Sequence, residues 1–101
     1  MKNTDRITAM EARLNSAEAA LRELLRALDA FDALQSDIDE LSRYLGSEEW
    51  FSDCEAWDRG ELPKGLRCGV LSQDSIYDLL SERRELAESM RGAADKILGQ
   101  R

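Results

Sequence analysis

Apolar residues recur in alternating steps of three and four along the first part of the chain. They are Ile7, Met10, Leu14, Ala17, Leu21, Leu24, Leu28 and Phe31. This spacing keeps the apolar residues on one helical face, and it is typical of a coiled-coil seam sustained for more than three heptads. It predicts a long amphipathic helix that begins near Asn3 or Thr4, because either side chain can cap it.

The alternation is interrupted once, where the step from Phe31 to Leu34 makes a second consecutive step of three. Such a shift acts as a stammer does in a coiled coil, so the helix either overwinds near residues 30–34 or bends there. Ile38, Leu41 and Leu45 then resume the alternation, and Gly46 is suited to end the helix. We therefore predict a helix over residues 1–45, about 60 Å long for roughly 40 residues.

A second periodic stretch follows Ser72, which is a good helix N-cap, and continues to Gly99. Its alternating positions are Ile76, Leu79, Arg83, Leu86, Met90, Ala93 and Ile97. Arg83 breaks the apolar series, so its side chain is expected to reach an acidic residue of the facing helix. This helix, over residues 72–99, is shorter than the first and covers about 39 Å for roughly 26 residues.

The connector between the two helices, residues 46–71, holds both tryptophans, both cysteines, the only proline and four of the six glycines. Ser47 can cap a short helix that carries Trp50, Cys54 and Trp57 on one face and ends at Gly60. The remainder predicts a loop with a turn around residues 63–66. Four aliphatic residues should pack this loop down, namely Leu62, Leu66, Val70 and Leu71.

The predicted fold is therefore all-α. A long antiparallel, coiled-coil-like helix pair is joined by a short connecting helix and a packed Gly/Pro loop. At 101 residues the chain, residues 1–101, has the length of a single helical domain.

The net charge is −7 and is unevenly distributed. Residues 29–82 hold four bases and fourteen acids, whereas the remaining residues hold ten bases and seven acids. An acidic chain lacks the basic face that nucleic acid requires. No apolar run of 18 residues is present, and the polar N-terminal stretch does not read as a secretory signal, so we expect no membrane association and a cytoplasmic protein with reduced cysteines.

Several runs make the chain similar to a known family. The opening DRITAME, the run YLGSEEWFSDCE and the run GELPKGLRCGVLSQDSIYDLL resemble a small bacterial domain-of-unknown-function family, the one numbered 4298. The chain departs from that pattern at Cys54, where an aromatic residue is more usual, and at Cys68, where a basic residue is more usual. The resemblance covers almost the whole chain. It implies a helical fold and brings no established activity.

The connector supplies the candidate partner-binding residues. Aromatic and acidic side chains gather on it and on the preceding helix, namely Asp37, Glu40, Glu49, Trp50, Asp53 and Trp57. The aromatic residues can form a platform for a partner or plug the end of the helix pair, and the second interpretation predicts that both indoles are mostly buried. The acidic residues can engage a basic partner or simply form a solvated face.

We predict no catalytic residue, metal site or cofactor. The chain has no histidine, and the spacing of its two cysteines matches no zinc pattern. Glu82, Glu85 and Glu88, together with Asp37 and Glu40, faintly resemble the carboxylate sets by which all-α hydrolases hold Mg²⁺. A small Mg²⁺-dependent hydrolase is therefore the alternative hypothesis, although a solvated face accounts for the same residues.

The leading hypothesis is a structural or protein-interaction module. Because the first helix exceeds the last in length, part of its seam needs another partner, and a second copy is the nearest one. We predict a homodimer through the first helix, for which the unequal charge of the two ends favours an antiparallel arrangement. A bend near residues 30–34 would instead allow a compact three- or four-helix monomer.

Overall fold

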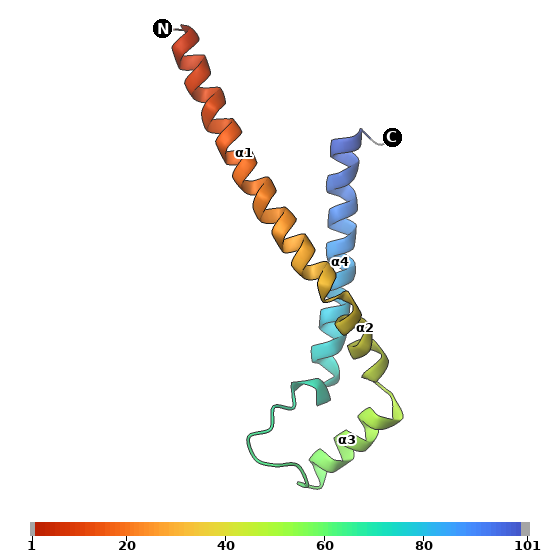
Figure 1. Cartoon of the computed structure of the whole chain (residues 1–101). Coiled ribbons are helices and arrows are strands. Elements are labelled where there is room, and N and C mark those ends of the chain that lie inside the picture. Colours follow the sequence, from red (N-terminus) through yellow and green to blue (C-terminus); the bar gives the residue numbers. More distant parts are fainter. Residues whose placement is uncertain (1, 100–101) are drawn as a thin grey trace. The chain divides into compact units, whose positions relative to one another are not determined.

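The computed structural model describes residues 2–99, and every regular element in that range is helical. Figure 1 shows the order of the elements along the chain. They are α1 (Lys2–Ala33), α2 (Gln35–Tyr44), α3 (Glu48–Asp58), the short 3₁₀ helix η1 (Gly69–Leu71) and α4 (Gln73–Leu98). The predicted all-α class is confirmed.

The chain divides into two units, residues 1–36 and residues 37–101. The first unit consists of α1 and the start of α2. None of the 32 residues of α1 is buried, although Phe31 near its end is half-buried. The first unit by itself therefore supplies no packing partner for the apolar seam of this helix.

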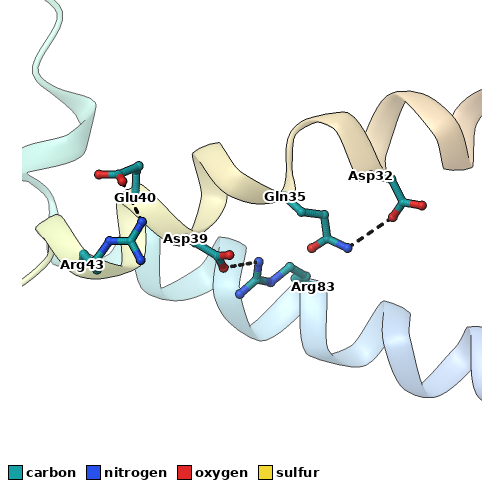
Figure 2. Close-up of polar contacts among 6 residues, drawn as sticks. All are labelled: Asp32, Gln35, Asp39, Glu40, Arg43 and Arg83. Carbon is teal, nitrogen blue, oxygen red and sulfur yellow. Dashed lines mark hydrogen bonds and ion pairs between the residues drawn. The ribbon is translucent and has the colours of Figure 1, made fainter.

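The structure divides the segment predicted as one helix over residues 1–45. The interruption falls on Leu34, whose backbone N–H donates to the carbonyl of Phe31 at 3.0 Å instead of to the carbonyl four residues back. A bond to the third preceding residue belongs to the tighter 3₁₀ geometry. The helix thus overwinds at the position where two consecutive steps of three shift the seam. The Gln35 side chain donates to Asp32 at 3.3 Å across the interruption (Figure 2).

In the second unit α2 and α4 lie side by side and run antiparallel (Figure 1). Arg83 of α4 extends to Asp39 of α2, with Nη1 and Oδ1 3.1 Å apart (Figure 2). The prediction that Arg83 reaches an acidic residue of the facing helix is confirmed. Ile38 of α2 and Ile76 of α4 are the buried apolar residues among those described, with exposed fractions of 6% and 3%.

The predicted helix ends around the connector and at the end of α4 agree with the observed ones, but α1 begins at Lys2, so Asn3 and Thr4 lie inside the helix and do not cap it. Gly46 follows α2 with a φ of 80°, a left-handed conformation that costs glycine little because it has no Cβ. The Ser47 hydroxyl caps α3 by accepting from the N–H of Trp50 at 3.1 Å. Gly60 follows the end of α3, and Gly99 caps α4. Ser72 occupies the N-cap position of α4, without a capping bond from its side chain.

The loop after α3 contains the predicted turn, in which the N–H of Leu66 donates to the carbonyl of Pro63 at 3.3 Å. Its packing is looser than expected. Leu62 is half-buried, as is Leu71 in η1, but Leu66 and Val70 are 53% and 39% exposed. The expectation that all four aliphatic residues pack down is wrong for these two. Although η1 contacts both α3 and α4, only Leu71 of its two aliphatic residues is half-buried.

Candidate functional site

The connector is held together by contacts between α3 and η1. The indole N–H of Trp50 donates to the carbonyl of Val70 at 3.0 Å, and the Cys54 thiol donates to the carbonyl of Leu71 at 3.8 Å. Trp50 and Cys54 are four residues apart and share a face of α3, so both meet the same short helix. Both residues are half-buried.

Trp57 does not follow the prediction that both indoles are mostly buried, since it is 55% exposed. It lies two turns beyond Trp50, in the last turn of α3, whereas the bond to η1 is made by Trp50. Phe51 is likewise 58% exposed, although its ring meets that of Trp50 edge to face with centroids 5.1 Å apart. The interpretation as a core plug holds in part for Trp50, and it is wrong for Trp57.

Asp53 has an internal hydrogen-bond partner that the sequence pattern does not indicate. The Tyr44 hydroxyl, at the end of α2, donates to Oδ2 of Asp53 in α3 at 2.5 Å. This hydrogen bond to a carboxylate, together with partial burial and the negative charge, raises the pKa of Tyr44 to about 12. No sequence signal marks the pair, because the two residues are nine positions apart on separate helices.

We expect Tyr44 to ionise only near pH 12. With Tyr77 replaced by phenylalanine, a titration of phenolate absorbance reports Tyr44 alone, while far-UV circular dichroism shows whether the chain stays folded. Because the folded pKa lies above the ordinary value of 10, the stabilisation by this bond is fully present below pH 10. It is lost as the pH rises from 10 to about 12. Asp53→Asn should move the midpoint toward 10, and equal midpoints in the two proteins would contradict the assignment.

The remaining acidic candidates are spread over two helices. Asp37 lies in the first turn of α2 and Glu49 in the first turn of α3, where carboxylates favour the helix dipole. Glu40 pairs with Arg43 on its own helix at 2.6 Å (Figure 2). All three are exposed. The structure therefore distributes the six predicted partner-binding residues over α2 and α3, with Trp50 and Asp53 already engaged in internal bonds.

The carboxylates of the alternative hydrolase hypothesis do not form a cluster. Glu88 pairs with Arg91 at 3.8 Å, and Glu40 pairs with Arg43. Within residues 2–99, no group of three or more acidic or cysteine side chains is placed to hold a metal ion. The geometry therefore gives the Mg²⁺-dependent mechanism no assembled ligand set.

Both cysteines are free in the structure and line one open cavity of about 450 Å³ between α3 and the segment around η1. Trp57 and Asp58 line the same cavity. Desolvation raises the pKa of the Cys54 thiol, and the nearby charges of Asp58 and Asp53 raise it further. A raised pKa keeps the thiol protonated at neutral pH and makes it a poor nucleophile.

The second candidate surface is the seam of α1. The large apolar residues of the seam, together with Leu25 on its flank, are between 36% and 64% exposed, namely Ile7, Met10, Leu14, Leu21, Leu24, Leu25 and Leu28. Single exposed apolar residues are common on protein surfaces, but a contiguous apolar stripe makes this face of α1 a candidate interaction surface. No helix within the described residues is long and apolar enough to cross a membrane.

The described elements are all helical. Hydrogen bonds between α3 and η1 hold the connector, and α1 carries an exposed apolar seam. The chain belongs to the domain-of-unknown-function family DUF4298, whose model matches residues 7–93. The predicted resemblance is thereby confirmed over most of the chain. Comparisons with curated proteins and with solved structures give no match.

Proposed function

We propose that the protein is a helical interaction module that forms a homodimer through α1. The observation that carries the proposal is the exposure of the α1 seam, in which Leu21 and Leu24 remain 58% and 64% exposed. In this proposal the chain acts by binding and has no catalytic role of its own.

The length and composition of α1 support a need for a partner. Most of the stability of a helix in a protein comes from packing its apolar face, and α1 has no buried residue over its 32 positions. Burying a leucine side chain contributes about 1.5–3 kcal/mol. A second copy of the same helix supplies a seam of equal length and equal spacing.

The connector offers a weaker basis for binding. Trp50 and Asp53 are used in hydrogen bonds within the unit, and Glu40 is neutralised by Arg43. Glu49 and Trp57 are exposed but have no further feature that would select a partner. We therefore place the interaction surface on α1 and not on the connector.

Sedimentation equilibrium of the full chain at tens of micromolar should give twice the mass of the monomer. Leu21→Glu places a charge in the seam of both copies and should raise the dimer dissociation constant by more than about 100-fold, because two buried leucines are lost. Ala19→Glu adds the same charge on the opposite side of α1 and serves as the matched control. It should leave the dissociation constant within about threefold of the original, since a surface change usually costs under about 0.5 kcal/mol.

A monomeric wild-type chain under these conditions would overturn the proposal. Equal effects of Leu21→Glu and Ala19→Glu would also overturn it, because the dimer would then use some other surface.

A further inference from the structure

The flanks of the α1 seam carry charges in a regular order. With Ile7 and Met10 assigned to heptad positions a and d, each flank of the seam contributes one residue per heptad. The g positions are Arg6, Arg13, Ala20 and Ala27, and the e positions are Glu11, Glu18, Leu25 and Asp32. All eight are exposed on one continuous helix. One flank is therefore basic or small, and the other is acidic except at Leu25.

We propose that α1 pairs with α1 of a second copy in a parallel, in-register coiled coil, oriented by ion pairs of Arg6 with Glu11 and of Arg13 with Glu18 between the copies. The inference rests on the proposed function, since it specifies the partner and the orientation of that same surface.

A parallel, in-register pair satisfies the flanks of both helices. In this geometry each g residue faces the e residue five positions later on the other helix. Arg6 then meets Glu11, and Arg13 meets Glu18, on both sides of the pair. In the single chain the two arginines donate to neutral oxygens of their own helix, Asn3 Oδ1 at 3.0 Å and the Ala9 carbonyl at 3.3 Å. Their charges are therefore available for carboxylates of the second copy.

The same rule accounts for Leu25, the apolar residue on the acidic flank. It is 51% exposed in the chain, and a parallel pair sets it against Ala20 of the second copy. An antiparallel pair sets e positions against e positions, so that Leu25 faces Glu11 or Glu18 of the second copy in the registers that overlap most of the two helices. That arrangement buries no apolar contact at Leu25 and brings acidic residues of the two flanks together.

These local charges oppose the antiparallel arrangement that the unequal ends of the chain favour. The net charge of an end of the chain is the sum of charges spread over many exposed residues, and charges farther apart than the Debye length, about 8 Å at physiological ionic strength, are largely screened from one another. Ion pairs formed across the seam are much closer than that, so we expect the flanks of α1 to set the orientation.

Disulfide trapping tests the orientation. In a Cys54→Ser/Cys68→Ser background, Asn3→Cys introduces a thiol at a d position, and oxidised glutathione serves as the oxidant. A parallel dimer brings the two thiols together, so most of the chain should become a covalent dimer. Asp5→Cys, on the opposite side of the helix, is the matched control and should remain largely uncrosslinked.

Charge reversal provides a second measurement. Glu11→Arg/Glu18→Arg replaces four attractive pairs per dimer by repulsive ones and should raise the dissociation constant by at least about tenfold. Adding Arg6→Glu/Arg13→Glu to the same chain restores opposite charges and should return it near the original value. If the wild-type chain is a dimer but the Asn3→Cys variant does not crosslink, the parallel orientation alone is overturned. The same holds if the charge-reversal variant does not lose affinity or the combined variant does not regain it. A monomeric wild-type chain would overturn the proposed function itself.

Discussion

Ile76→Ala is expected to lower the free energy of unfolding of the second unit by about 2–5 kcal/mol. Ile76 is 3% exposed, and only Ile38 is comparably buried among the described residues. Alanine removes three buried carbon atoms and leaves a cavity that so small a core can fill only in part. Since native domains are stable by about 5–15 kcal/mol, this loss is a large share of the total.

The same helix offers a matched control in Ile97, which is 83% exposed. Ile97→Ala should change the free energy of unfolding by less than about 0.5 kcal/mol. Urea unfolding followed by far-UV circular dichroism measures both, at one chain concentration, because self-association adds to apparent stability. A similar effect of the two substitutions would show that Ile76 is not in a packed core.

Trp50→Ala is expected to cost about 3 kcal/mol, near the lower end of the range for large aromatic residues in cores. The lower end applies because Trp50 is half-buried. The substitution removes the ring that packs beside Phe51 and the bond to the carbonyl of Val70. Trp50→Phe keeps most of the apolar area and should cost mainly the hydrogen bond, about 1 kcal/mol.

Trp57→Ala is the control for this series, because Trp57 lies on the same helix and is 55% exposed. It should cost under about 1 kcal/mol, and far-UV circular dichroism is again suitable because tryptophan fluorescence changes with the residue removed. If Trp57→Ala proved as destabilising as Trp50→Ala, the second indole would be packed in the folded protein after all.

Local structure was predicted well because its determinants are close in the sequence. The Ser47 cap acts over three residues, and Gly46 ends α2 through its own backbone conformation. The interruption at Leu34 is visible in the sequence as two consecutive steps of three. In the structure the N–H of Leu34 donates to the carbonyl of Phe31, three residues back. The Asp39–Arg83 ion pair was also indicated by the sequence, because Arg83 is a basic residue in an otherwise apolar series and was expected to reach an acidic residue of the facing helix.

Contacts between elements were predicted less well. Tyr44 and Asp53 form a hydrogen bond whose partners belong to different helices and to no recognisable spacing. Trp50 and Trp57 carry the same periodic signal, but Trp50 is half-buried and bonded to η1, whereas Trp57 is 55% exposed. Whether an aromatic residue is covered depends on where a loop of irregular conformation places its few apolar residues.

The sequence by itself determined the helices, their ends and the apolar seam of α1, since backbone hydrogen bonds and side-chain periodicity act within a few residues. The tertiary structure alone decided which apolar faces are buried. Ile38 and Ile76 are enclosed, whereas the equally periodic leucines of α1 are exposed in the chain. Periodicity specifies that a face is apolar, but burial requires another surface of matching length and shape, and that surface is set by the packing of distant segments.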